Sequence, residues 1–430
     1  MHQAAQHYAR QGRHLAASLR ASLSVSAALL AAACAGTTEP AGKRPGPLTE
    51  LPRALSVAEQ KVLGAGNEFT FALFRAVTEA QRGKNVFVSP LSASMALGMT
   101  MNGAAGPTFD QMRTALSFGS ASQEEINEGY KGSIALLRGL DGSVDFRLAN
   151  SIWYRRDFPF TPSFLDAART WFDAEVRGLD FTQPAAALGA VNGWVNQSTG
   201  GKIPTIIDEI RDDQVMFLIN AIYFKGKWRE RFDPAETRDA QFHGAGGQQP
   251  MKLMHRHGKM AYLRTPQFQA VDLPYGRGAF AMTVLLPTEG TDVESLATSL
   301  RRDTWATWTE QFREVQMDLY LPRLKLEYER KLNDDLEALS MRDAFVPDGA
   351  DFTRMAPAPI GHHLYIDFVK QKTFVDVNEE GTEAAAATAV GVGFTSLPPT
   401  MRVDRPYLFA IRERLSGTIL FIGKIVSMPS

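Results

Sequence analysis

Hydrophobic and polar residues follow two different periods along this chain of 430 residues. Apolar side chains recur at helical spacing over residues 55–80, which predicts an amphipathic helix, and five other segments alternate or run continuously apolar as strands do. The predicted strands are residues 215–224, 280–286, 316–326, 365–377 and 418–425. The first two are dense enough in apolar residues to be buried on both faces. Because helices and strands do not alternate regularly, the pattern predicts one α+β domain over residues 54–430.

The first 33 residues have a different character from the rest of the chain. Arg10, Arg13 and Arg20 give a basic start, and residues 21–33 follow as an uncharged, mostly apolar run. That run is shorter than the about 20 residues that a membrane-spanning helix needs, but it fits the core of a signal peptide. We therefore expect residues 1–33 to be a signal peptide and the protein to be exported, as a lipoprotein of the cell envelope or as an extracellular protein.

Cys34, the only cysteine, follows the apolar run directly. The string LLAAACAG resembles the lipobox of bacterial lipoproteins, although Leu30 stands four residues before the cysteine where that motif prefers three. The resemblance implies that Cys34 is lipidated and anchors the protein to a membrane. The alternative is an ordinary signal peptide cut after residues 31–33, which leaves a free thiol. A single cysteine excludes an intramolecular disulfide.

Residues 34–53 contain four prolines, with several glycines and threonines, and read as a flexible tether between the anchor and the body. The net charge of -1 and the 22% of charged residues are ordinary for a globular protein. Nothing in this composition favours nucleic acid as a partner.

The sequence offers no catalytic or metal-binding constellation. His255 and His257 would point to one side of a strand, and His362 and His363 are adjacent in a predicted turn, but neither pair has a cysteine or carboxylate at ligand spacing. The G-x-S-x-G, H-E-x-x-H and Walker motifs do not occur. We therefore expect no enzyme activity, no metal and no cofactor.

Several strings resemble, in chain order, segments of the serpins, a family of serine protease inhibitors. They include NVFVSPLSASMALGMTMNGAAGPTFDQM from Asn85, VNGWVNQSTGGKIPTII from Val191, LINAIYFKGKWRERFDP from Leu218 and DRPYLFAIRERLSGTILFIGKI from Asp404. The resemblance covers residues 56–429 and, with the lipobox, points to a bacterial member. It implies the serpin fold, in which eight or nine helices surround three β-sheets and a reactive-centre loop, here about residues 379–400, is exposed near the C-terminus.

The segment from Asn378 to Pro406, NEEGTEAAAATAVGVGFTSLPPTMRVDRP, resembles this loop. Its alanines favour a helix, whereas the glycines and valines over residues 390–393 oppose one. Such conflicting preferences suit a segment that must change structure.

In serpins, a protease cleaves this loop and is trapped as an acyl-enzyme while the loop enters the central sheet as a strand, so the intact fold is metastable. The resemblance assigns the hinge of the loop to Glu379, Glu380, Gly381, Thr382, Ala384, Ala385, Ala386, Ala387 and Thr388. Side chains alternate across a strand, so Thr382, Ala384, Ala386 and Thr388 would face the core and must be small and uncharged, as they are. Gly381 would give the backbone its freedom to turn.

The usual serpin spacing puts the scissile bond between Thr395 and Ser396, fourteen residues beyond Gly381. A loop one residue shorter would be cut between Phe394 and Thr395. These residues suit elastase-like, chymotrypsin-like or subtilisin-like proteases, and the absence of Arg and Lys there disfavours trypsin-like ones. The alternative function is a non-inhibitory serpin acting as a binding protein or chaperone. Against it, no charged residue lies between Ala384 and Thr395.

The resemblance also assigns residues that control opening of the central sheet. These are Ser89, Ser92, Asn192, Trp228 at the entry point for the loop, and Gln371 where many serpins carry a histidine. An amide does not titrate near neutral pH, so pH-gated opening through Gln371 is not expected. The expected partner is a target serine protease in a covalent complex with a monomeric inhibitor. No heparin-type cofactor is expected, because residues 121–130 are acidic.

Overall fold

The computed structural model describes residues 46–244, 246–381 and 398–429, and from Pro47 onward they form one compact unit. The predicted signal peptide, Cys34, both candidate scissile bonds and the hinge from Thr382 onward lie outside the described residues. Within the described ranges, no helix has the length and apolar character needed to cross a membrane.

Helix α2 (Val57–Ala80) confirms the helix predicted at residues 55–80. Ser56 begins it through a capping box with Glu59, in which each side chain accepts a hydrogen bond from the other's backbone N–H. Its apolar stripe, which includes Phe69 and Phe74, is fully buried. The other α-helices of the described ranges are α3 (Pro90–Met101), α4 (Gly106–Ala115), α5 (Gln123–Gly139), α6 (Pro162–Phe172), α7 (Pro184–Ser198), α8 (Val293–Ser299), α9 (Arg302–Gln311) and α10 (Asn333–Ala338).

The largest sheet has nine strands in the order β1-β14-β13-β8-β7-β6-β9-β12, with β5 paired to β6. Its members are β1 (Val86–Val88), β5 (Arg238–Gly244), β6 (Gly247–Arg264), β7 (Phe268–Pro274), β8 (Phe280–Pro287), β9 (Arg313–Pro322), β12 (Thr400–Arg402), β13 (Tyr407–Glu413) and β14 (Ile419–Ile425). Every position of β8, β13 and β14 is buried. The predicted strands at 280–286 and 418–425 are therefore confirmed.

Two smaller sheets complete the fold. One has the order β3-β2-β4, and the other pairs β10 with β11. Their strands are β2 (Val144–Arg155), β3 (Ala174–Leu179), β4 (Met216–Gly226), β10 (Leu324–Lys331) and β11 (Lys370–Val377). Strand β4 has no exposed position, because α7 covers Phe217 and Ile219 while Ile222 and Phe224 join the main core. Residues 215–224 are therefore buried or half-buried throughout, so the prediction of burial on both faces holds only in part.

Two predicted strands were wrong in extent. The alternating run 316–326 divides into β9 and β10, which lie in different sheets. The N–H of Arg323 still bonds the carbonyl of Lys252 on β6 of the large sheet at 2.8 Å, whereas Leu324 already pairs with Val377 of β11. The strand predicted at 365–377 begins only at Lys370, where its partner β10 ends. The alternation of apolar and polar residues alone shows neither where a strand changes sheet nor where its pairing begins.

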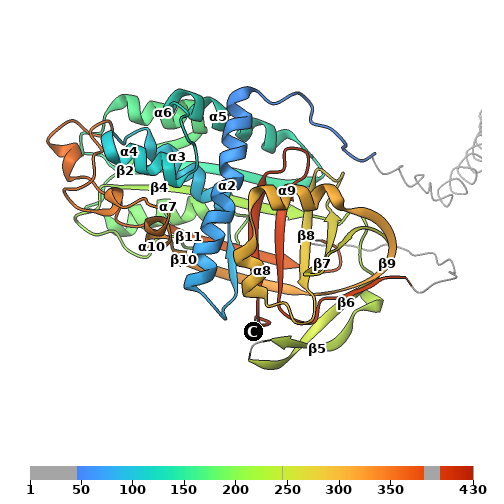
Figure 1. Cartoon of the computed structure of the whole chain (residues 1–430). Coiled ribbons are helices and arrows are strands. Elements are labelled where there is room, and N and C mark those ends of the chain that lie inside the picture. Colours follow the sequence, from blue (N-terminus) through green and yellow to red (C-terminus); the bar gives the residue numbers. More distant parts are fainter. Residues whose placement is uncertain (1–45, 245, 382–397, 430) are drawn as a thin grey trace, which may run out of the picture. The chain divides into compact units, whose positions relative to one another are not determined.

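In the described ranges the fold is of the α+β class, with three sheets and nine α-helices, arranged as shown in Figure 1. Helices α3, α5 and α6 lie on one side of β2 and β4, and α7 lies on the other (Figure 1). Leu48 and Leu51, at the end of the predicted tether, pack against the core. The N–H of Leu48 also bonds the carbonyl of Arg277 at 2.8 Å. The last part of that segment thus belongs structurally to the body.

Candidate functional site

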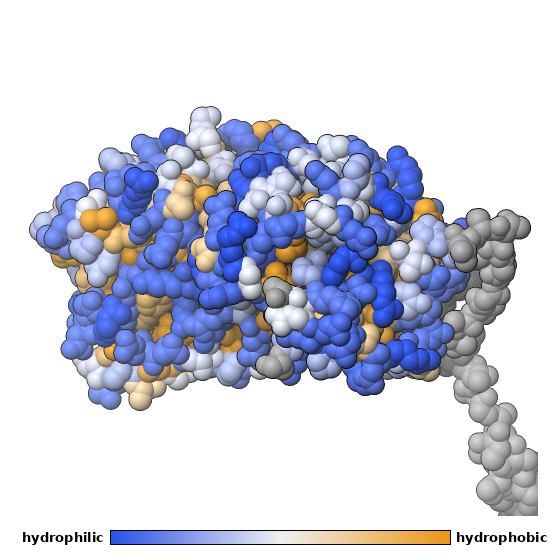
Figure 2. Space-filling view, turned by 60° about the horizontal axis from the view of Figure 1, so that its bottom comes forward, coloured by the Kyte–Doolittle hydropathy of each residue, from blue (hydrophilic) through white to orange (hydrophobic). Residues whose placement is uncertain are grey.

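A slot separates the two smaller sheets. Strand β4 pairs with β2 and strand β11 pairs with β10, but no pairing joins β4 to β11 among the strands the structure describes. A cavity of about 190 Å³ lies between them, lined by residues 215–222 on one side and 364–373 on the other, with α3 beneath. Two facing strand edges can accept a further strand between them. Hydrophilic residues cover most of the face shown in Figure 2, and apolar residues show mainly in recesses between them.

Gln371 latches one edge of the slot to the start of α3. The N–H of Ser89 donates to Oε1 of Gln371 at 2.8 Å, and Nε2 of Gln371 donates to the carbonyl of Ser89 at 2.8 Å. The hydroxyl of Ser89 donates to the carbonyl of Leu420 at 2.7 Å, which ties the latch to β14. Both Ser89 and Gln371 are buried. The structure therefore brings these two predicted residues together, in contacts that an amide makes without titrating.

Ser92 marks the other edge of the slot. Its hydroxyl donates to the carbonyl of Asn220 on β4 at 3.3 Å. The amide nitrogen of Asn220 donates to Oδ1 of Asn150 at 2.6 Å, whereas its Oδ1 is buried and, among the described residues, has no hydrogen-bond partner. Sequence reasoning missed Asn220, although it is the polar residue within the apolar run LINAIYF. A buried acceptor without a partner costs free energy, so we expect Oδ1 of Asn220 to gain a hydrogen-bond donor in another state of the protein.

Asn192 lies outside this cluster. It belongs to α7, and its Oδ1 accepts from the N–H groups of Ile206 at 2.9 Å and Ile207 at 3.2 Å, while its Nδ2 donates to the carbonyl of Ile207 at 2.8 Å. Ile206 and Ile207 line the cavity. Asn192 therefore shapes the slot indirectly, by fixing the segment that follows α7.

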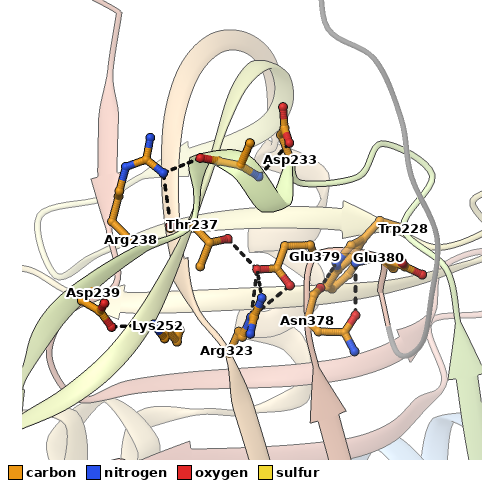
Figure 3. A network of polar contacts seen from close by, with 11 residues as sticks. Trp228, Asp233, Thr237, Arg238, Asp239, Lys252, Arg323, Asn378, Glu379 and Glu380 are labelled. Carbon is orange, nitrogen blue, oxygen red and sulfur yellow. Dashed lines mark hydrogen bonds and ion pairs between the residues drawn. The ribbon is translucent and has the colours of Figure 1, made fainter.

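Trp228 closes the mouth of the slot, where β4 and β11 end (Figure 3). Its Nε1 donates to the carbonyl of Asn378 at 2.9 Å, and its backbone N–H donates to the carbonyl of Glu380 at 2.8 Å. The indole stacks on Tyr275, with ring centroids 4.3 Å apart. Trp228 thus joins the end of one edge strand to the end of the other.

Glu379 is a buried, charged residue at this end of the slot, and its carboxylate points toward Arg323 and Thr237 (Figure 3). Its carboxylate accepts from Nη2 of Arg323 at 2.7 Å and from the hydroxyl of Thr237. Burial acts to raise the pKa of Glu379, but the hydrogen bonds from Arg323 and Thr237 outweigh it and lower that pKa below its ordinary value. The N–H of Phe232 bonds the carbonyl of Glu379 at 2.9 Å, so segment 232–237 holds this end of the loop by backbone and side chain alike.

Gly381 occupies a position that only glycine can take. It exchanges two backbone hydrogen bonds with Asn378, of 3.0 and 3.2 Å, which makes Glu379 and Glu380 the two central residues of a tight turn. Its φ is +128°, and a Cβ atom there would lie 2.2 Å from the carbonyl oxygen of Gly226. Gly381 also forms an antiparallel bridge with Lys227. The hinge glycine therefore lies between the ends of the two edge strands.

The histidines gain partners that their spacing did not show. His255 and His257 lie on β6, and both contact the carboxylate of Asp318 on the neighbouring strand β9. His363 contacts Asp348 at 2.7 Å. In the described part of the chain, no group of three or more His, Cys, Asp or Glu side chains is placed to hold a metal ion.

From Pro47 onward the described residues thus form one compact unit, in which two small sheets face each other across a cavity and Gly381 lies at the ends of their edge strands. The family described as Serpin (serine protease inhibitor) matches residues 64–428. Bovine leukocyte elastase inhibitor is 35% identical over 385 residues, which cover 86% of this chain and all of that protein. The chain belongs to the serpin family, and the predicted serpin fold is confirmed. Relatives such as the bovine protein are named as inhibitors rather than as enzymes.

Two solved structures share the fold. Tengpin, a thermophilic serpin in its native state, has a TM-score of 0.77 and 29% identity over 90% of this chain and 97% of its own. Human thyroxine-binding globulin, solved in complex with thyroxine, has a TM-score of 0.79 and 26% identity over 87% of this chain and 100% of its own. The fold thus occurs both in proteins named as protease inhibitors and in a protein named for thyroxine binding.

Proposed function

We propose that this protein is a suicide inhibitor of serine proteases, in which the cleaved loop enters the slot between β4 and β11 as a new strand. The observation that carries this proposal is the pair of antiparallel bridges that Gly381 makes at the mouth, to Lys227 beside β4 and to Asn378 beside β11. A strand that continued from Gly381 with this register would lie between the two edges.

The register of these bridges agrees with the hinge sequence. Continued one residue at a time, it would place residue 384 between Phe224 and Val375, and residue 386 between Ile222 and Thr373. All four flanking residues are buried. The even-numbered residues of the inserted strand would then face the core, as the small side chains at these positions require.

The same register would place Thr388 between Asn220 and Gln371. A threonine hydroxyl there could donate to the buried Oδ1 of Asn220, the acceptor that has no partner among the described residues of the intact protein. Insertion would thus satisfy a polar atom that the slot leaves unsatisfied.

The free energy of insertion would trap the protease. About a dozen newly paired residues, at about 1 kcal/mol net for each hydrogen bond and with added burial, would release on the order of 10 kcal/mol. The protease serine attacks the loop and forms an acyl ester. Insertion then moves the tethered enzyme and distorts its oxyanion hole before water completes hydrolysis. Inhibition is a race between insertion and deacylation.

We propose Thr395–Ser396 as the scissile bond, with Phe394–Thr395 as the alternative. Small or aromatic residues at this position fit elastase-like, chymotrypsin-like and subtilisin-like pockets. The similarity to a protein named leukocyte elastase inhibitor supports the elastase-like choice. Mass spectrometry of the peptide released from the complex would identify the cleaved bond.

The decisive experiment uses adjacent alanines as a matched pair. Incubation with an elastase should give a covalent complex that survives boiling in detergent. Ala386→Arg would place a charge in the core row and should turn the inhibitor into a substrate, whereas Ala385→Arg would point outward and should still form the complex. Cleavage without complex in the unmodified protein would contradict the proposal. It would favour a carrier role, as in the thyroxine-binding relative.

Export and lipid anchoring through Cys34 remain proposals that rest on the sequence of the first 34 residues. A Cys34→Ala variant should move from the membrane fraction to the soluble fraction of its host. Equal partition of both proteins would contradict the anchor and leave an ordinary signal peptide as the explanation.

A further inference from the structure

A second set of contacts crosses the slot at the end away from Trp228. Asp367, three residues before β11, accepts two hydrogen bonds from the segment that leads into β4. Nη2 of Arg211 and Nε2 of Gln214 both donate to Oδ2 of Asp367, at 2.7 and 2.8 Å. Burial acts to raise the pKa of Asp367, but these two hydrogen bonds outweigh it and lower that pKa, so the carboxylate is ionised at neutral pH. The two edges of the slot are therefore joined directly at this end.

Two aromatic rings meet across the slot at the same level. Phe217 of β4 and Phe368 have their ring centroids 6.2 Å apart. Phe217 belongs to the smaller hydrophobic cluster, which α7 covers, and Phe368 packs against that cluster from the opposite edge. We call the five residues that make these contacts the catch: Arg211, Gln214, Phe217, Asp367 and Phe368. The catch thus combines charged hydrogen bonds with an apolar contact, and both span the slot.

Each side of the catch is fixed by its own part of the chain. The N–H of Arg211 donates to Oε1 of Gln214 at 3.0 Å, which closes a tight turn before β4. On the other side, Nδ2 of Asn333 donates to the carbonyl of Asp367 at 3.0 Å, and its Oδ1 accepts from the N–H of Val369 at 2.9 Å. Because both segments are held in place, moving the edges apart has to break the contacts of the catch.

The inserted loop would reach the catch last. In the register that begins at Gly381, residue 391 would lie between Phe217 and Phe368, and residue 392 between Met216 and Asp367. A strand between two edges holds them about 10 Å apart, which is twice the spacing of neighbouring strands. Completing the insertion would therefore require the catch to open.

The sequence of the loop changes at this level. Alanine occupies the outward positions 385, 387 and 389, whereas glycine occupies positions 391 and 393. These are the first glycines after Gly381. A side chain at position 391 would have to share the outer face of the slot with two aromatic rings, and glycine has none. The glycines thus agree with a strand that passes beneath the ring pair.

We propose that the catch controls the last step of insertion, and thereby the share of inhibitor molecules that are cleaved without trapping a protease. This inference rests on the proposed function. While the catch is closed, the loop pairs only as far as residue 390, and water still has time to hydrolyse the acyl ester. Opening the catch lets the strand run to the far end of the slot. Asp367 and Phe368 are therefore positioning residues, which act on the timing of insertion and not on the acyl bond.

Synthetic loop peptides of two lengths test the catch without a protease. Peptide 382–388 would end between Asn220 and Gln371, before the catch, whereas peptide 382–393 would pass it. Each peptide carries a fluorescent label at its N-terminus and is mixed with the intact, full-length protein, and fluorescence anisotropy follows the rate of binding. We expect Asp367→Asn to bind the longer peptide about fivefold faster and the shorter one at an unchanged rate. A fivefold change corresponds to about 1 kcal/mol, the upper range for a partly exposed ion pair.

Asp145→Asn is the matched control. Oδ2 of Asp145 also lies 2.7 Å from an arginine Nη2, but this partner, Arg147, is on the same strand, β2. The side chain of Asp145 is 39% exposed and that of Asp367 is 31% exposed. Asp145→Asn should bind both peptides as the unmodified protein does. Phe368→Ala should also bind the longer peptide faster, which keeps the test valid if Asp367→Asn folds poorly. A longer peptide with Gly391→Leu should bind more slowly.

The two peptides separate failure of the catch from failure of the proposed function. The catch is overturned if Asp367→Asn and Phe368→Ala leave binding of the longer peptide unchanged. It is also overturned if they accelerate both peptides alike, because the substitutions would then only loosen the sheet. If neither peptide binds the unmodified protein, the slot does not accept a strand, and the proposed function is contradicted together with the catch. With an elastase, the ratio of cleaved inhibitor to covalent complex should fall about fivefold in Asp367→Asn, and an unchanged ratio would contradict the control of trapping.

Discussion

The nine-stranded sheet and the divided central sheet contrast in how their strands are held. In the first, β13 pairs with β8 on one side and β14 on the other, and every residue of the three strands is buried. In the second, β4 and β11 face each other across a cavity. Side-chain contacts hold them in place, chiefly Gln371 on Ser89 and Trp228 on Asn378. The strands of the first region are paired on both sides, whereas β4 and β11 in the second region are not paired with each other.

Filling the slot should give the largest effect on stability. Cleavage of the loop by a protease that escapes the trap should raise the melting temperature by about 20 °C or more, because insertion would release on the order of 10 kcal/mol. Differential scanning calorimetry of intact and cleaved protein measures this. If cleaved and intact protein have the same melting temperature, the loop does not stabilise the fold by entering the slot.

Replacing the hinge glycine should have the next largest effect. Gly381→Ala brings a Cβ atom within 2.2 Å of the Gly226 carbonyl oxygen at a φ of +128°, and it should destabilise the intact protein by about 2–3 kcal/mol. Gly247→Ala is the control, since Gly247 has a φ of +103° with no atom within 4 Å of its Cβ position. If both variants lose the same free energy of unfolding in urea, the positive φ alone explains the loss and the close approach to Gly226 adds nothing.

The latch at the floor of the slot should contribute somewhat less. Gln371→Ala leaves the buried N–H and carbonyl of Ser89 without their partners, which should cost about 2 kcal/mol and make the slot easier to open. Gln60→Ala, which removes an exposed amide on α2, should change the free energy of unfolding by less than about 0.5 kcal/mol. If the two substitutions cost the same, the latch is not what keeps the edges in position.

The charge at the mouth should give the smallest effect, visible only in acid. The pKa of Glu379 is lowered in the folded protein, so its pairs contribute stability at neutral pH that is lost as the pH falls through the ordinary carboxyl range to the folded-state pKa. Arg323 is 46% exposed, so the contribution should be below about 1 kcal/mol. Melting curves from pH 7 to pH 3.5 should show a smaller acid loss in Glu379→Gln. If the melting temperatures of the variant and the unmodified protein depend on pH in the same way, the ion pair of Glu379 does not contribute to stability.

The elements of the paired region could be predicted from the sequence because their signals are local. Ser56 and Glu59 begin α2 through contacts within one helical turn, and the continuous apolar run of β8 is typical of a strand with two buried faces. The need for a glycine at residue 381 could also be predicted, and the φ of +128° and the close approach of the Gly226 carbonyl oxygen agree with it.

The divided region could be predicted only in part, because its contacts join distant segments. The run across Pro322 and Arg323 keeps its alternation while the chain passes from one sheet to another. The partner of Asn220 lies 70 residues away in sequence, and Asp318 reaches His255 across 63. Asn192 resembled a residue of the sheet-opening cluster, but its side chain bonds the segment that follows its own helix.

In the proposed mechanism, the slot accepts the cleaved loop in the register that begins at Gly381. A crystal structure of the loop-cleaved protein tests it most directly. We expect a strand between β4 and β11 that is antiparallel to both, with Thr388 between Asn220 and Gln371 and its hydroxyl within hydrogen-bond distance of Oδ1 of Asn220. A cleaved loop outside the sheet, with β4 and β11 paired directly to each other, would contradict it.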